Sequence, residues 1–311
     1  MKNGIVVIGA TFVDIKGYPS GQYVPNGRNA GNVIEVHGGV SRNIAEDIAN
    51  IELRPTFLSI VDESALGQEV IDKLNRHKVN TSYIRKVKDG LGTWLAIFSN
   101  EGDVVGSISK RPDLSQILRI LNEEGDEIFA EADSICVEFD IEALILKKIF
   151  ELADKYHKKV YCPISNMSIA IERRDLIQRS GILVCNVQEA GLLFSDDYCS
   201  MTPEELMPVI DRNVKRAHYP GMVVTMGGKG AVYAELNGEP GYCPPINVGV
   251  VDTTGAGDAF FSGVAIGLTY GKTLGEACRI GTRMASSVIS TTDNVCPRFL
   301  PSEFDLEFGN P

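Results

Sequence analysis

The chain has 311 residues, of which 44% are hydrophobic and 23% charged, the usage of a globular protein with a sizeable core. The formal net charge of −11 disfavours binding to nucleic acid and to acidic membranes. Seven cysteines without a Cys-x-x-Cys pair and four scattered histidines argue against a disulfide framework and a zinc site. The sequence has no cleavable signal and no apolar run long enough to cross a bilayer, so we expect a cytoplasmic protein.

Apolar runs alternate with amphipathic segments along most of the chain. Residues 5–8 are continuously apolar, as in a buried parallel strand, and a strand over 55–61 precedes a helix over 62–76. Short apolar strands follow at 135–137, 160–162 and 182–185, with a helix reaching about residue 157 between the first two. This alternation predicts an α/β protein built as a three-layer α/β/α sandwich in a single domain spanning 1–311.

Two β ribbons interrupt this alternation early in the chain. Residues 18–32 are rich in Gly, Pro and Asn and precede alternating residues 33–36, while runs at 92–99 and 104–109 flank a predicted turn at 100–103. We expect them to form a small β-sheet lid from about 15–37 and 92–112. Trp94, Ala96 and Phe98 would lie on one face, with Leu95 and Ile97 on the other. Because both faces need cover, we predict a homodimer through the lid.

Glycines and helix caps mark three further segments. Gly38 and Gly39 precede Ile44, Ala45 and Ile48, which share a helical face, and Ser41 could cap that helix. The strand at 182–185 ends in a capping pattern, and glycines join two strands within 221–233. A capping box predicts a helix over 273–289.

Residues 247–263 predict a strand, a tight turn and a helix. The backbone N–H groups of Gly255, Ala256 and Gly257 would point out of the helix N-terminus and form a site for an anion such as a phosphoryl group. Asp258 could be an ordinary first-turn carboxylate that stabilises the helix dipole. Together with Asp252, however, it suggests one group that accepts a proton from a hydroxyl and another that orients substrate or a cation. Neither a P-loop nor a dinucleotide fingerprint occurs.

The heptad Asp252-Thr-Thr-Gly-Ala-Gly-Asp258 resembles the signature of the ribokinase-like (PfkB) carbohydrate and nucleoside kinases, whose final Asp is the catalytic base. The segment Gly38-Gly-Val-Ser-Arg-Asn43 resembles the first signature of that family. In the form it takes here, preceded by Gly31-Asn-Val-Ile-Glu35, it is most similar to pseudouridine kinases.

The resemblance implies phosphoryl transfer from ATP, with Mg²⁺ and a monovalent cation such as K⁺, to a small-molecule nucleoside or sugar. Pseudouridine, phosphorylated at its 5′-hydroxyl, is the favoured substrate. A sugar kinase acting on ribose, fructose or a related sugar is the first alternative, and an adenosine-type nucleoside kinase the second. A metabolite sensor would have lost the base or the anion site, and neither is lost here.

The same resemblance implies a set of site residues. It makes Asp258 the base and has the amides of Gly255, Ala256 and Gly257 stabilise the transferred group. It places the substrate against Asp14, Gly39, Asn43 and Glu138, and the nucleotide against Asn186, Thr225, Gly227 and Gly228. It has Glu189 hold Mg²⁺ through water, and Asp252 and Thr254 hold the monovalent cation, with the loop 291–297 enclosing adenine.

The sequence departs from the family pattern at two positions. Phe12 stands where the family usually has Asn, which suggests an aromatic ring that stacks on the substrate, and Cys162 replaces an acid and receives no role. Lys110, Arg111 and Asp113 end the second ribbon where a lid would overhang substrate, although surface charge explains them equally well.

Overall fold

The computed structural model describes residues 4–100, 104–164 and 166–306. A large sheet contains β1 (Gly4–Ile8), β4 (Thr56–Val61), β5 (Ile84–Lys86), β8 (Ala132–Val137), β9 (Val160–Pro163), β10 (Ile182–Asn186), β11 (Gly221–Thr225), β12 (Ala231–Glu235) and β13 (Gly241–Cys243). A small sheet contains β2 (Phe12–Pro19), β3 (Gly31–Gly38), β6 (Gly92–Phe98) and β7 (Val104–Lys110). The helices are α1 (Val40–Asn50), α2 (Ala65–Arg76), α3 (Ser115–Glu123), α4 (Gly125–Glu131), α5 (Ala143–Lys155), α6 (Met167–Ile171), α7 (Arg174–Ile177), α8 (Val187–Phe194), α9 (Pro203–Ala217), α10 (Ala256–Thr269) and α11 (Leu274–Ile289). Two 3₁₀ turns, η1 (Gly227–Lys229) and η2 (Pro301–Phe304), complete the elements.

The large sheet runs in the order β13-β12-β11-β10-β9-β8-β1-β4-β5. The strands from β11 to β5 are parallel, and β12 and β13 add antiparallel strands at one edge. Continuous apolar runs form the central strands because both faces of a parallel sheet are covered by helices. The predicted α/β/α sandwich is confirmed.

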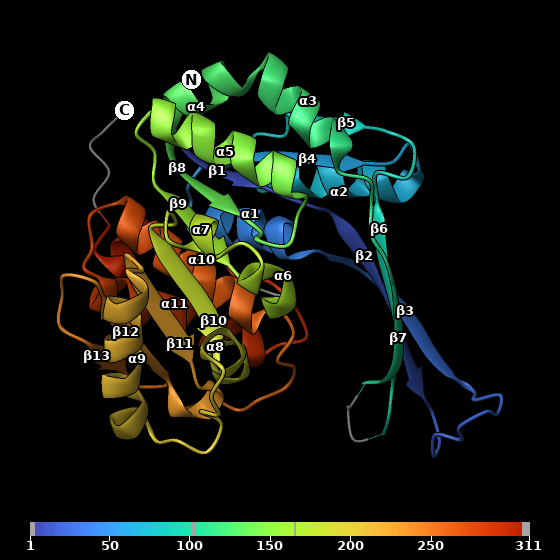
Figure 1. Cartoon of the computed structure of the whole chain (residues 1–311). Helices are drawn as coiled ribbons and strands as arrows, with labels where there is room; N and C mark the ends of the chain where they lie inside the picture. Colours follow the sequence, from blue (N-terminus) through green and yellow to red (C-terminus); the bar gives the residue numbers. More distant parts are fainter. Residues whose placement is uncertain (1–3, 101–103, 165, 307–311) are drawn as a thin grey trace.

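Alternating side chains of each central strand belong to two separate cores. Val6 and Ile8 of β1 pack in the core that contains buried residues of α3, α4, α5 and α9. Ile5 and Val7 point to the opposite face, into the core that contains buried residues of α1, α2, α10 and α11. These two layers of helices lie on either side of the sheet (Figure 1). The second layer brings the N-termini of α1 and α10 together.

The small sheet projects away from the sandwich as long, extended strands in the order β3-β2-β6-β7 (Figure 1). Its register pairs Asp14 with Trp94 and Ile15 with Leu95, so that Asp14 shares a face with Trp94 while Leu95 lies on the other. Trp94 packs edge-on against Phe98, with ring centroids 6.4 Å apart. This sheet fits the predicted lid, although most of its predicted turn at 100–103 lies outside the described residues.

Two local expectations were wrong. Residues 247–251 are irregular rather than a strand, because no strand of the described residues pairs with them. The amide of Val251 instead donates to the carbonyl of Ile289, at the end of α11, at 2.7 Å. Ser41 does not cap α1, whose N-cap is Gly39; the Ser41 hydroxyl instead donates to the carbonyl of Ile8 at 3.2 Å.

Within the described part of the chain, no helix is long and apolar enough to cross a membrane. All seven cysteines are free, and six of them are buried, in agreement with the absence of a disulfide pattern in the sequence.

Candidate active site

The predicted base and the predicted sugar-binding helix meet at one point. Asp258 lies in the first turn of α10, and Asn43 lies in the first turn of α1, 215 residues earlier. The Asn43 amide nitrogen donates to Asp258 Oδ2 at 2.6 Å. The tertiary structure therefore brings the two family signatures into direct contact.

Arg42 sets the orientation of the Asn43 amide. Its side chain is fully buried, and it donates from Nη2 to Asn43 Oδ1 and from Nη1 to Glu46 Oε2 at 2.6 Å. Because Asn43 Oδ1 accepts from a guanidinium that has no acceptor lone pair, the amide nitrogen must be the atom that faces Asp258. Sequence reasoning missed Arg42; its place beside the signature Asn was the available signal.

Burial raises the pKa of Asp258 to about 6, and the Asn43 hydrogen bond opposes part of this rise. A carboxylate whose pKa lies close to the working pH is suited to accept a proton from a substrate hydroxyl.

We predict that kcat/KM rises with pH and reaches half its plateau near pH 6, because only the deprotonated Asp258 accepts a proton. In Asn43→Ala the hydrogen bond that stabilises the carboxylate is lost, so the half-plateau should move to higher pH. Both profiles are measured as kcat/KM, which reports the free enzyme. The same midpoint in both proteins would show that Asn43 does not tune the base.

Asp14 and Glu138 approach this point from the lid and from the end of β8. Glu138 Oε1 accepts from the backbone N–H of Ser41 at 2.9 Å, and burial raises the Glu138 pKa to about 8, with the charges of Asp140 and Asp258 adding to the rise. Burial also raises the pKa of Asp14, against the opposing charges of Lys16 and Arg42. The Asp14 charge also adds to the rise in the Asp258 pKa, so the three carboxylates influence one another. The contact of Asp14 and Glu138 with substrate stays a prediction.

Two glycines with positive φ begin the helices that meet here. Gly39 (φ 97) is the N-cap of α1, and Gly255 (φ 83) is the N-cap of α10. The Ala256 amide donates to the Thr253 carbonyl at 3.3 Å. This corrects the expectation that the amides of all three residues in the predicted anion site point freely outward. An anion bound at the N-terminus of α10 would therefore be held chiefly by the amides of Gly255 and Gly257.

A cavity of about 300 Å³ adjoins this helix terminus. Predicted residues from two distant segments line it: Thr225 at the end of β11 with Gly227 and Gly228 after it, and Ala256 and Gly257 of α10. Apolar residues form much of the remaining wall: Pro245, Ile246, Val250, Phe260, Ala285 and Ile289. A site with polar glycine-rich backbone at one end and an apolar wall suits a nucleotide, with its phosphates on the glycines and its base on the wall.

Asn186 and Glu189 form a capping box at the start of α8. Asn186 at the end of β10 pairs with Thr225 at the end of β11, so both lie at the carboxyl ends of neighbouring parallel strands. Neither Asn186 nor Glu189 lines the nucleotide cavity. Burial raises the pKa of Glu189, and the hydrogen bond that its carboxylate accepts from the backbone N–H of Asn186 lowers it in part.

No group of three or more His, Cys, Asp or Glu side chains among the described residues could hold a metal ion by itself. Asp252 accepts at Oδ1 from the Thr254 amide at 2.9 Å, and a Cβ on Gly255 would lie 2.1 Å from the carbonyl oxygen of Asn294. The carbonyl of Asn294 therefore lies close to Gly255, three residues after Asp252.

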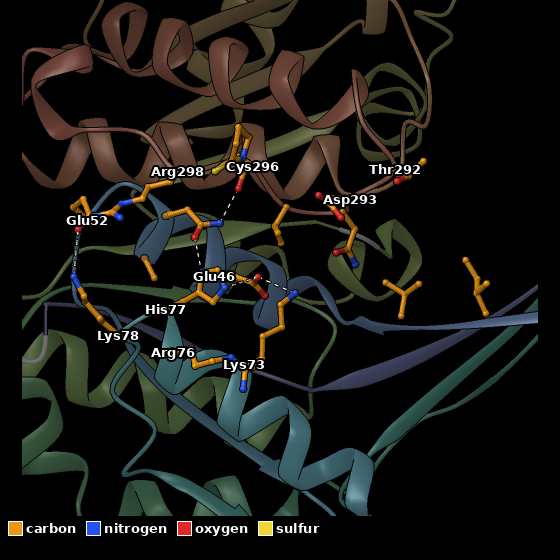
Figure 2. Close-up of a pocket in the computed structure, with 17 residues that line it drawn as sticks. Glu46, Glu52, Lys73, Arg76, His77, Lys78, Thr292, Asp293, Cys296 and Arg298 are labelled. Atoms are coloured by element: carbon orange, nitrogen blue, oxygen red, sulfur yellow. Dashed lines mark hydrogen bonds and ion pairs between the residues drawn. The ribbon is translucent and has the colours of Figure 1, made fainter.

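A larger cavity, of about 720 Å³, lies between α1, the end of α2 and the loop 292–298 (Figure 2). Lys73 donates to Glu46 Oε1 at 2.9 Å, and His77 lies 3.6 Å from the same oxygen. Of the predicted site residues, only the loop expected to enclose adenine contributes to this wall, through residues 292–297. None of these residues lines the 300 Å³ cavity proposed for the nucleotide.

A model of the pfkB family carbohydrate kinases matches residues 2–295. The chain belongs to the pfkB family. Two related proteins are a guanosine-inosine kinase from Exiguobacterium acetylicum, 32% identical over 94% of this chain and 96% of that protein, and a pseudouridine kinase from Escherichia coli, 25% identical over 93% and 91%. Membership in the pfkB family makes the protein a phosphotransferase with an alcohol acceptor, a sugar or nucleoside kinase.

Solved structures of pfkB-type kinases share the fold. The ribokinase of Arabidopsis thaliana, in complex with ribose and ATP, superposes with a TM-score of 0.85 at 21% identity and covers 99% of this chain and 100% of that chain. The adenosine kinase of Sinorhizobium meliloti gives a TM-score of 0.76 at 19% identity, over 95% and 96% of the two chains.

Proposed function

We propose that the protein transfers the γ-phosphoryl group of ATP to the 5′-hydroxyl of a nucleoside, with guanosine and inosine as the first candidates. The observation that carries the transfer is the position of the Asp258 carboxylate. Asp258 lies in the first turn of α10, beside the glycine N-cap, and accepts a hydrogen bond from Asn43 of α1. The guanosine-inosine kinase is more similar to this chain than the pseudouridine kinase is, 32% against 25% identity, and supports a purine nucleoside.

In this proposal Asp258 accepts the proton of the attacking hydroxyl. The helix terminus that begins at Gly255 stabilises negative charge on the transferred group, and Gly227 and Gly228 hold the remaining phosphates. When bound, Mg²⁺ neutralises phosphate charge, and Glu189 would hold it through water. Asp14 and Glu138 orient the sugar hydroxyls.

Pseudouridine is the second candidate. The segment 31–45, with Gly31-Asn-Val-Ile-Glu35 before the glycine pair, is similar to pseudouridine kinases and favours it.

A screen of ADP release tests the proposal. Guanosine, inosine, pseudouridine, uridine, adenosine, ribose and fructose are each supplied with ATP and Mg²⁺. We expect the highest kcat/KM with inosine or guanosine. A preference for pseudouridine would select the second candidate, activity on ribose or fructose alone would make the protein a sugar kinase, and no ADP release with any of them would contradict the proposal.

We also propose that K⁺ activates the enzyme, because Asp252 and Thr254 lie beside the anion site. Replacing K⁺ by Na⁺ or by a bulky organic cation at constant ionic strength is expected to lower kcat. A rate that does not change with the cation would exclude this role for Asp252 and Thr254.

The lid is proposed to pair with the lid of a second subunit. On the face of the small sheet away from Asp14, cross-strand neighbours Ile15, Leu95 and Ile108 line up, and Ile108 is 72% exposed. Exposed apolar residues on a projecting sheet favour burial against a partner.

We expect a dimeric mass in sedimentation at low micromolar concentration. Ile108→Asp should shift the mass toward the monomer, because it places a charge in the buried interface. Leu144→Asp is the control, since Leu144 of α5 is also exposed (66%) but lies outside the lid. A monomeric wild-type protein with full activity would refute the shared lid.

A further inference from the structure

A cavity of about 210 Å³ lies beside the proposed sugar site, and none of the proposed catalytic steps uses most of its wall. Phe12 of β2 and Glu138 after β8 form part of its wall. Arg111, Asp140 and Arg173 form much of the rest. Glu138 accepts from the amide of Ser41, two residues before the Asn43 that contacts Asp258, so this cavity adjoins the point where the hydroxyl of the substrate would meet the base.

Asp140 is only 8% exposed, and its two carboxylate oxygens differ in their hydrogen bonding. Oδ2 accepts from Arg111 Nη2 at 2.5 Å. Oδ1 is buried and accepts no hydrogen bond from any described residue. Leaving a buried carboxylate oxygen without a donor is costly, so a donor from outside the chain is expected at this position.

The backbone around Asp140 is held in place. Arg173 Nη1 donates to the carbonyl of Phe139 at 2.8 Å and also donates to that of Ile141, so both neighbours of Asp140 are anchored. Arg111 Nη1 donates to the Asp140 carbonyl at 3.3 Å, and the Arg111 side chain is 56% exposed. The guanidinium carries five N–H donors, so it retains donors for a ligand after these contacts.

Asp140 Oδ1 is thus an unpartnered acceptor in the same wall as the donors of Arg111, and a base that enters the cavity would uncover it by a small rotation of the carboxylate. This matches a ring N–H beside a carbonyl, the lactam edge that guanine and hypoxanthine carry at N1 and O6. Adenine presents the opposite arrangement, an acceptor at N1 beside an amino donor, and a free sugar has no such edge. The aromatic ring of Phe12, on the same cavity wall, supplies an apolar face for the base.

We propose that Arg111 and Asp140 form the base-reading subsite of this kinase and select a nucleoside whose base carries a lactam edge, a 6-oxopurine first. The proposal rests on the nucleoside kinase function proposed above. Asp140 and Arg111 bind the base and take no part in the proton transfer, so they determine specificity and leave the chemistry to Asp258.

Asp140→Asn tests the subsite with little change in shape. The amide oxygen is expected to turn toward Arg111, which places an NH₂ donor where the acceptor Oδ1 was. We expect kcat/KM for inosine to fall about 10- to 100-fold, as for the loss of one hydrogen bond to a charged group, while kcat/KM for adenosine changes little. Thermal unfolding shows that the variant is folded, and Asp113→Asn is the control, because exposed Asp113 lies two residues after Arg111 without lining the cavity.

1-Methylinosine provides the matching change in the substrate, because methylation at N1 removes the donor. Wild-type enzyme is expected to discriminate against it by at least the same factor, and Asp140→Asn should lose much of that discrimination. Equal losses for inosine and adenosine in Asp140→Asn, or wild-type enzyme that uses 1-methylinosine as well as inosine, would overturn the subsite while leaving the kinase proposal intact. Activity on ribose without activity on any nucleoside would overturn the nucleoside function and the subsite with it.

Discussion

Asp258→Asn is expected to lose about 10²–10⁴-fold in kcat, the range for removal of a general base. The amide keeps the shape of the carboxylate but cannot accept the proton of the attacking hydroxyl. Because the glycine N-cap and the nucleotide cavity are unchanged, affinity for ATP should stay close to that of wild type. Turnover is measured together with nucleotide binding by titration calorimetry.

The control for Asp258→Asn is Asp126→Asn. Asp126 lies in the first turn of α4, where it is exposed and pairs with Lys155 at 2.8 Å, so the same chemical change should leave kcat unaltered. Near-normal turnover in folded Asp258→Asn protein would remove this residue from the role of base.

Gly255→Ala is expected to destabilise the protein and to abolish most activity. Gly255 has φ 83, and a Cβ there would lie 2.1 Å from the carbonyl oxygen of Asn294. Backbone held in this region costs a residue other than Gly about 1–3 kcal/mol, and the clash adds to that cost. The N-terminus of α10 and the loop at Asn294 would have to separate, which would displace the anion site and Asp258 together.

Gly257→Ala separates backbone strain from blockage of the anion site. No atom lies within 4 Å of a Cβ built on Gly257, and its φ is not positive. We expect its stability in urea unfolding to equal or slightly exceed that of wild type, while activity falls because the methyl group enters the proposed phosphoryl site. If Gly255→Ala were as stable as Gly257→Ala, the close approach of Asn294 would not constrain this turn.

Local patterns predicted the elements whose stability depends on nearby residues. The capping boxes at Asn186 and Thr273 form as expected because each joins residues three positions apart. The sequence also predicts which side chains share a face of the lid with Trp94, because side chains alternate along a strand whatever the strand packs against. Three valines, Val248, Val250 and Val251, favour a strand, but residues 247–251 remain irregular. A strand also needs a neighbouring strand with which it exchanges backbone hydrogen bonds.

The sequence by itself determined the α/β sandwich, the glycine turn before Asp258 and the family to which these belong. Only the tertiary structure decided that Asn43 bonds Asp258, that Arg42 orients Asn43, and that Asp140 keeps an unpaired oxygen beside Arg111. The physical reason is separation along the chain: caps, turns and periodicity act over a few residues, whereas these contacts join segments that meet only when the helices and strands pack. Burial, which raises the pKa of Asp258 to about 6, is likewise a property of the packed protein and cannot be read from its neighbours in sequence.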